Sequence, residues 1–244
     1  MKKTILYTAL AGAQIGLLSA ASIAVNFIEN AANQGFAGGT NIGPTSINSS
    51  NWNNTIDFDT GTLANGGFNA GSIKDDSGAT VAAATLTWTS PNVYYNGAGT
   101  AGDEARLFVG YLDDGGAGNS FTLSNHGYAQ YDVYILATGD AGNGTGGTAT
   151  FTHGEMTVNG VNVGTHAALG YNGGTWVEST GGTNGNYIVF SGQTAANLTV
   201  SSTNVGGRGP VNGFIIVDTT PVPEPSSAAL LGLGGLALIL RRRK

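Results

Sequence analysis

The sequence predicts an all-β protein: a single jelly-roll-like β-sandwich over residues 22–220, with a short apolar helix at each end of the chain. Short runs of β-branched and aromatic residues recur between clusters of Gly and Asn, a pattern typical of strands joined by tight turns. Glycine makes up 41 of the 244 residues, without the three-residue repeat of collagen. The middle of the chain lacks the period of about 3.6 residues that marks an amphipathic helix. A segment of about 200 residues suits one sandwich or barrel.

The predicted strands are runs rich in Val, Ile, Thr and aromatic residues that end at turn-forming residues. They are Ile23 to Ile28, Thr55 to Phe58, Thr80 to Thr89, Arg106 to Leu112, Ser120 to Leu123, Tyr131 to Thr138, Thr148 to Thr152, Met156 to Val163, Tyr187 to Phe190, Asn197 to Ser201 and Val211 to Val217. Within Met156 to Val163, the pair Asn159-Gly160 lies between alternating residues and predicts a type I′ hairpin.

The first segment, residues 1–21, has the pattern of a signal peptide. Lys2 and Lys3 precede an apolar run that ends in small residues, as a charged region, a hydrophobic region and a cleavage site do. We expect signal peptidase to cleave near Ala21, with Ala24 as the alternative position. A buried or membrane-spanning first helix is the competing interpretation.

The last segment, residues 221–244, combines three features in a fixed order. Pro223, Glu224 and Pro225 precede an apolar stretch from Ala228 to Leu240, and a basic cluster closes the chain: Arg241, Arg242, Arg243 and Lys244. A helix over the apolar stretch is about 20 Å long, shorter than the hydrocarbon core of about 30 Å, so it is a marginal membrane span. The basic cluster is expected to stay cytoplasmic and to stop transfer. An ordinary C-terminal anchor helix is the alternative.

This segment resembles the PEP-CTERM sorting signal. The resemblance implies processing at or near Pro223-Glu224-Pro225 by exosortase, a membrane protease-transpeptidase of bacteria that make exopolysaccharide. It implies a transient anchor in the inner membrane, followed by delivery to the cell surface or the extracellular matrix. Export would bring the chain into contact with exopolysaccharide.

The middle of the chain more loosely resembles ectodomains of PEP-CTERM proteins that look like galactose-binding-type or concanavalin-like sandwiches. The matching pattern is Tyr131-Asp132-Val133-Tyr134, then Asn186 to Phe190, then Arg208 followed by Val211 to Val217. This resemblance implies a fold and no particular ligand.

Charge and cysteine content exclude several classes of function. Between residues 22 and 220, three Lys or Arg stand against fourteen Asp or Glu, a net charge of −11. Nucleic-acid binding requires clustered cations and is not expected. The chain has no Cys, which removes disulfides, thiolate metal sites and Cys nucleophiles; a domain of about 200 residues folds without disulfides.

Acidic residues at Gly- and Asn-rich turns are candidate ligands for a structural Ca²⁺ ion, which prefers carboxylate and carbonyl oxygens. The candidates are Asp57, Asp59, Asp75, Asp76, Asp103, Asp113 and Asp114. No EF-hand or Gly-Gly-x-Gly-x-Asp repeat is present, and Asp favours turns for its own backbone reasons. We therefore expect that no cofactor is required and keep calcium as an open alternative.

Aromatic side chains in loop-like contexts are candidate sugar platforms. Tyr94, Tyr95 and Trp176 fit that description, and Arg208 with Asn212 is a candidate polar pair for a ligand or for a structural bridge. Trp88 lies in an alternating strand pattern, so core packing is expected for it.

Catalytic motifs are not found. His126, His153 and His166 lack the spacing of a zinc site, and no Gly-x-Ser-x-Gly is present. A pair of carboxyl groups for glycoside hydrolysis could arise in any secreted fold. We therefore expect a non-enzymatic surface or matrix protein that binds polysaccharide. A polysaccharide hydrolase or lyase and a purely structural matrix scaffold are the alternatives.

Overall fold

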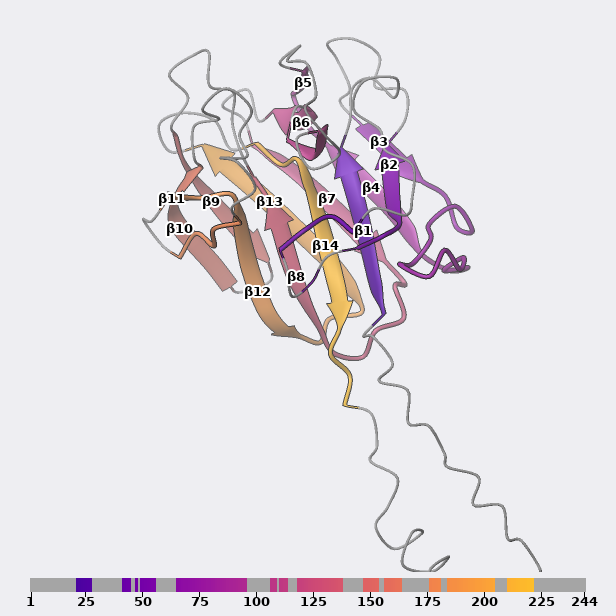
Figure 1. The fold of residues 1–244 in the computed structure, drawn as a ribbon. Helices are drawn as coiled ribbons and strands as arrows, with labels where there is room; N and C mark the ends of the chain where they lie inside the picture. The colour runs from indigo at the N-terminus through magenta and orange to yellow at the C-terminus, as the bar shows by residue number, and fades with distance from the viewer. Residues whose placement is uncertain are drawn as a thin grey trace, which may run out of the picture.

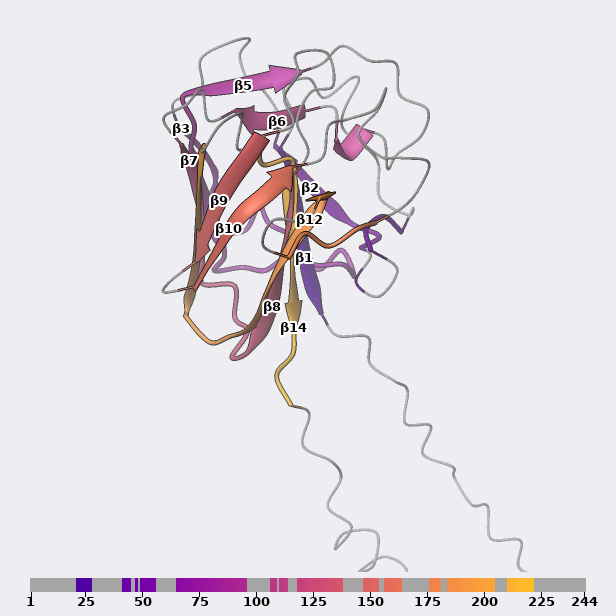
Figure 2. The same ribbon diagram turned by 90° about the vertical axis from the view of Figure 1, so that its left-hand side faces the viewer.

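Two β-sheets packed face to face form the body of the protein (Figures 1 and 2). The computed structural model describes residues 21–27, 41–44, 47, 49–55, 65–95, 106–108, 110–113, 118–137, 147–153, 156–163, 176–180, 184–204 and 210–221. The prediction of an all-β protein is confirmed for these residues. The signal peptide and the C-terminal helix lie outside them, and no helix within them is long and apolar enough to cross a membrane.

The five-stranded sheet has the order β12-β8-β14-β1-β2. Its strands are β1 (Ser22–Phe27), β2 (Trp52–Thr55), β8 (Tyr131–Leu136), β12 (Tyr187–Gln193) and β14 (Gly213–Asp218). Neighbours are antiparallel except β1 and β2, which run parallel. Strand β14, the last described strand, therefore pairs with the first strand β1.

The seven-stranded sheet has the order β11-β10-β9-β13-β7-β4-β3. Its strands are β3 (Asn65–Phe68), β4 (Thr85–Thr89), β7 (Asn119–Ser124), β9 (Gly147–His153), β10 (Met156–Val163), β11 (Asn184–Gly185) and β13 (Asn197–Asn204). A separate pair, β5 (Asn92–Tyr95) with β6 (Gly110–Asp113), lies across one end of the sandwich (Figure 1). Unequal sheets with a parallel pair at an edge of each depart from the two equal antiparallel sheets of a simple jelly roll.

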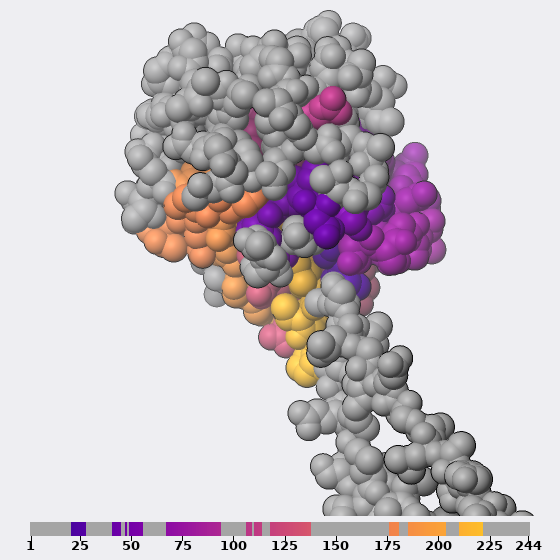
Figure 3. All heavy atoms as spheres, in the orientation of Figure 1, coloured from indigo at the N-terminus to yellow at the C-terminus, as the bar shows by residue number. Residues whose placement is uncertain are grey.

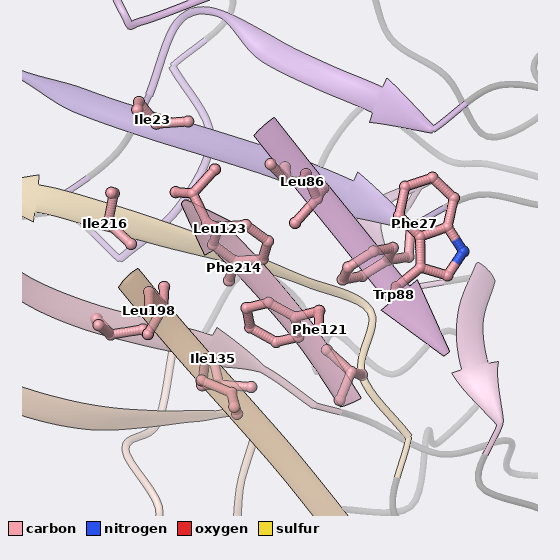
Figure 4. Packing of buried hydrophobic residues seen from close by; sticks show 14 of the residues in the cluster. Ile23, Phe27, Leu86, Trp88, Phe121, Leu123, Ile135, Leu198, Phe214 and Ile216 are labelled. Carbon is pink, nitrogen blue, oxygen red and sulfur yellow. The ribbon is translucent and has the colours of Figure 1, made fainter. Parts of the chain in front are cut away.

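The main core fills the space between the two sheets (Figure 4). Because side chains alternate along a strand, every second residue of each strand points into it: Ile23, Val25 and Phe27 of β1, and Phe121 and Leu123 of β7. The rings of Phe121 and Phe214, one from each sheet, stack with centroids 4.4 Å apart. Contacts of this kind hold the sheets together.

A second apolar cluster covers the opposite face of the five-stranded sheet. It joins Ala24, Leu136 and Ile215, which alternate with the core residues of their strands, to Trp52 and to three residues outside the two sheets, Ile42, Leu107 and Phe108. Both faces of this sheet are therefore apolar, which explains the unbroken burial of β1 and most of β14.

The outer face of the seven-stranded sheet is polar and uncharged where its side chains are described. The positions that alternate with the core are Thr85, Thr87, Thr89, Ser120, Thr122, Ser124, Asn197, Thr199, Ser201 and Thr203, all exposed or half-buried. This is the in-and-out alternation expected of a sheet with one solvated face.

Several predicted elements need correction. Asn159-Gly160 does not form a hairpin: β10 continues through it, paired with β9, and the register shifts by one residue between Val158 and Val161, which is a β-bulge. Glycine in a strand interior often marks such a bulge. The hairpin instead joins β9 to β10.

Other predicted boundaries shift. Arg106 and Leu107 form a helical turn before β6, and β4 begins at Thr85 rather than Thr80. Strand β2 ends at Thr55, the first residue of the predicted Thr55 to Phe58 run, and the rest of that run lies outside the described residues. Strands β3, β5 and β11 were not predicted. The short segments of β3 and β11 are rich in Gly and Asn and give little strand signal, whereas β5 contains the strand-forming residues Val93, Tyr94 and Tyr95, which were interpreted as part of a loop.

Candidate functional site

A row of three half-buried aromatic rings lies on the outer face of the five-stranded sheet. Trp176, Tyr187 and Tyr134 follow one another, with ring centroids 6.3 Å apart from Trp176 to Tyr187 and 6.3 Å from Tyr187 to Tyr134. We call these three residues the aromatic patch. In Figure 3, which looks onto this face, the orange atoms at the left belong to residues 176–180 and 184–204.

Strand pairing places the rings of the patch. Tyr134 lies in β8, and Tyr187 begins the neighbouring β12. Trp176 lies beside them because the chain that follows it is hydrogen-bonded to the start of β12. The Val177 N–H donates to the side-chain Oδ1 of Asn186 at 2.8 Å, and the Asn186 N–H donates to the Val177 carbonyl at 2.9 Å. The Ser179 N–H donates to the Tyr187 carbonyl at 2.8 Å.

The second apolar cluster supports the patch from below. Trp176 packs on the buried ring of Phe108 with centroids 5.3 Å apart, and the patch residues border the cluster that contains Leu136 and Ile215. Rings seated on a packed layer are held in fixed positions while part of each ring faces solvent, which suits recognition by shape.

Two carboxylates flank the patch. Burial raises the pKa of Tyr134, and the charges of Asp132 and Glu178 raise it further. Burial and Glu178 likewise raise the pKa of Tyr187. Both phenols therefore stay protonated at neutral pH and can donate or accept a hydrogen bond. One carboxylate oxygen of Asp132 already accepts the Gly192 N–H at 2.7 Å.

The structure places the predicted aromatic candidates in different regions. Trp176 belongs to the patch, whereas Tyr94 and Tyr95 lie in strand β5, paired with Tyr111 and Gly110, rather than in a loop. Trp88 is 7% exposed and packs in the core as expected. Tyr134 and Tyr187 were not predicted as site residues. Each alternates with core residues of its strand and so lies on the outer face of the five-stranded sheet, which the sequence does not identify as a face that carries aromatic rings.

Asn212 acts as a structural bridge. It is fully buried, and its side-chain amide donates to the carbonyls of Gly110 at 3.0 Å and Phe108 at 3.3 Å. It thereby ties β14 to the segment that carries the ring beneath Trp176. Its predicted partner, Arg208, lies outside the described residues.

The candidate calcium ligands are only partly described. Asp75 holds its own turn, since its Oδ1 accepts from the Ser77 N–H, the Ser77 hydroxyl and the Ala79 N–H at 2.6–3.0 Å. Asp76 accepts from the Ser22 N–H at 3.2 Å, and Asp113 is buried in β6. Asp57, Asp59, Asp103 and Asp114 lie outside the described residues. Within the described part of the chain, no three His, Asp or Glu residues are grouped to hold a metal ion.

His126 lies buried between β7 and β8. Its Nδ1 accepts the Tyr128 N–H at 3.2 Å, and its ring meets Tyr131 edge to face at 4.5 Å. Burial lowers the pKa of His126, while the Ala195 backbone and the Asp218 charge oppose that shift. His153 lies in β9, and His166 falls outside the described residues.

Comparison with known proteins identifies the end of the chain. A family model for the PEP-CTERM protein-sorting motif matches residues 221–244. The motif supports export and sorting by exosortase, with a cell-surface or extracellular destination. No curated protein and no solved structure matches the chain, so the resemblance to galactose-binding-type or concanavalin-like sandwiches stays a prediction.

Proposed function

We propose that this exported protein is a non-enzymatic surface or matrix component whose β-sandwich binds a neutral polysaccharide at the aromatic patch. The signal peptide directs export, and the basic cluster at the C-terminus holds the chain in the inner membrane until exosortase acts. The single observation that carries the binding proposal is the row formed by Trp176, Tyr187 and Tyr134.

The chemistry of the patch favours sugars. Aromatic rings offer flat apolar area to the apolar faces of sugar rings, and phenol and carboxylate oxygens around them bond sugar hydroxyls. The centroids of neighbouring rings are 6.3 Å apart, with interplanar angles of 39° and 63°, so the patch offers a chain molecule successive contacts with rings of different tilt. A polymer fits such a row better than a single small ligand.

Charge selects the class of polymer. Asp132 and Glu178 flank the rings, and the whole segment 22–220 is strongly acidic. An anionic chain would therefore be repelled, so the proposal is restricted to uncharged polysaccharides.

Affinity gel electrophoresis of the exported protein tests this proposal. The gels contain either hydroxyethyl cellulose as a neutral polymer or alginate as an anionic one, each with Ca²⁺ or with a chelator. We expect retardation in the neutral gel only. Trp176→Ala and Tyr187→Ala should each weaken binding several-fold, since a ring that anchors an interface contributes more than about 1 kcal/mol.

Two further variants serve as controls. Thr87→Ala changes an exposed residue on the other sheet and should leave binding unchanged, and Tyr187→Phe keeps the ring packing if the alanine variants unfold. Binding that survives all patch variants would reject the patch, and binding to neither polymer would favour the structural scaffold. Release of shortened chains from either polymer would favour a hydrolase or lyase.

A further inference from the structure

The first backbone nitrogen of the sandwich points at a carboxylate. The Ser22 N–H donates to Oδ1 of Asp76 at 3.2 Å, and the Asp76 N–H returns a bond to the Ser22 carbonyl at 2.9 Å. Ser22 is 4% exposed, so its nitrogen is largely removed from water. This residue directly follows Ala21, the expected cleavage position of the signal peptide.

The Asp76 carboxylate is held in place by its loop. The Asn51 side-chain amide donates to the Asp75 carbonyl at 2.7 Å, and the Ser50 hydroxyl donates to the Asp76 carbonyl at 3.2 Å. Asp75 closes the turn that follows. A carboxylate fixed by its backbone loses little freedom when it gains a charged partner.

The surroundings of Ser22 are negative. Burial raises the pKa of Tyr128 above its usual range, and the charges of Asp75, Asp76 and Asp218 add to the shift, which places three carboxylates near one phenol. His126 lies beside Tyr128 in the same loop, where burial lowers its pKa and so favours the neutral ring. Among the described residues, neither Lys nor Arg forms an ion pair with Asp76. A cation at Ser22 would complement this charge.

We propose that signal peptidase hydrolyses the Ala21–Ser22 bond and that Asp76 then binds the new α-ammonium group of Ser22. Hydrolysis adds the oxygen of water to Ala21, which becomes a carboxylate, and both of its hydrogens to the nitrogen of Ser22, which becomes an ammonium group. The bond from an uncharged N–H to the Asp76 carboxylate thus becomes a bond between two charged groups. This inference rests on the proposed export of the chain. Signal removal would thereby place an ion pair at the start of β1.

Cleavage also removes one bond. In the uncleaved chain the Asp218 N–H donates to the Ala21 carbonyl at 2.8 Å, and this bond is lost with Ala21. A charge-assisted bond is roughly twice as strong as a neutral one, so the gain at Ser22 offsets the bond lost from Asp218. Ser22 also pairs with Val217 near the end of β14, and the sorting motif matches from residue 221. The two processed junctions therefore lie at the same end of the sandwich (Figure 1).

The test uses the full chain after export. Mass spectrometry of the recovered protein identifies its first residue, and acetic anhydride in limiting amount at about pH 7 then measures the reactivity of the α-amine. Lys74, the lone lysine between residues 22 and 220, is the internal reference in the same molecule. The unfolded protein in urea supplies the intrinsic ratio of the two rates.

An opposite charge within about 4–6 Å raises an amine pKa by about one unit or more, so the reactive free amine falls at least about tenfold. We expect the α-amine of Ser22 in the native protein to react about tenfold more slowly, relative to Lys74, than in Asp76→Asn. Glu178→Gln removes one charge at the aromatic patch instead, so the α-amine reactivity relative to Lys74 should be the same as in the wild type.

The outcomes separate this inference from the proposed function. Equal reactivity in wild type and Asp76→Asn, or a chain that begins elsewhere, such as at Val25, overturns the inference and leaves export intact. A recovered protein that keeps residues 1–21 contradicts the proposed processing itself. If Asp76→Asn does not fold, the pH dependence of the mature wild type decides. The charge of Asp76 raises the pKa of the Ser22 α-amine against the opposing effect of burial. An α-amine with a raised pKa stabilises the fold below its unfolded pKa of about 7.7–8.0, and this contribution must be lost as the pH rises through the folded value. A stability that does not decline between about pH 7 and 10 would refute the inference.

Discussion

The stacked pair of Phe121 and Phe214 offers a direct measure of how the two sheets hold each other. Phe121 belongs to β7 of the seven-stranded sheet, and Phe214 belongs to β14 of the five-stranded sheet. Their rings lie 4.4 Å apart at an interplanar angle of 7°, and both side chains are at most 1% exposed. We predict that Phe121→Leu and Phe214→Leu are energetically coupled.

The expected magnitude follows from the contacts. Leucine keeps most of the apolar volume, so each single change should lower the free energy of unfolding by about 1–2 kcal/mol, below the 3–5 kcal/mol, roughly, of a change to alanine. Phe27 packs on both rings, with centroids at 5.8 Å and 6.1 Å, and limits the collapse of the site. Because a ring pair contributes about 0.5–1.5 kcal/mol beyond its buried area, the double variant should lose less than the sum of the two singles by that amount.

Urea unfolding followed by circular dichroism gives the four free energies of the cycle. The control pairs Phe121→Leu with Ile42→Val, a residue of the second cluster on the far side of the five-stranded sheet; these changes should add within about 0.5 kcal/mol. A coupling between Phe121 and Phe214 no larger than that of the control pair would show that the rings do not stack and that the sheets are packed otherwise.

Three further changes test separate features of the fold. Gly213→Ala should lower the free energy of unfolding by about 2–3 kcal/mol in urea titrations, because a Cβ there would overlap the Val25 carbonyl of the paired strand; an unchanged midpoint would contradict the close approach of β14 to β1. Asn212→Ala should lower it by about 1–3 kcal/mol, because two buried carbonyls lose their donor, and hydrogen exchange at residues 106–113 should speed up; exchange confined to β14 would argue against the bridge. His126 has a lowered pKa in the folded protein, so the stability that it contributes is present above its unfolded pKa of about 6.5 and is lost as the pH falls below that value. His126→Gln should flatten this part of the stability profile between about pH 7 and 5, and an unchanged slope would exclude His126 as its source.

Alternation along single strands could be predicted from the sequence. In β7, Phe121 and Leu123 alternate with Ser120 and Thr122, and the structure buries the first pair and leaves the second on the outer face. The pattern is local because a strand places neighbouring side chains on opposite sides whatever its partners are. The same reasoning correctly assigned Trp88 to the core.

The bulge at Asn159-Gly160 shows where local reasoning fails. The dipeptide is favourable for a tight turn, but β9 pairs with the chain on both sides of it, and the hydrogen bonds of that longer ladder outweigh the preference of two residues. The partner strand, absent from any short window of sequence, determined the outcome.

Only one of the three residues of the aromatic patch was predicted from the sequence, for a related reason. Trp176 was predicted as a candidate because it lies among Gly and Asn, whereas Tyr134 and Tyr187 lie within predicted strands and were not considered as site residues. Only the pairing of β8 with β12 and the bonds of Val177 to Asn186 bring the three rings together. The site depends on contacts between segments that are distant along the chain.

The sequence by itself determined the sorting motif at residues 221–244 and the all-β class of the described residues. The sorting motif is read from adjacent residues, and the all-β class follows from alternation and turn residues, since both are properties of short segments. The tertiary structure alone decided which strands are neighbours. That pairing sets Ser22 against Asp76 and beside the end of β14, because hydrogen bonds between strands join residues whose separation along the chain leaves no trace in the local pattern.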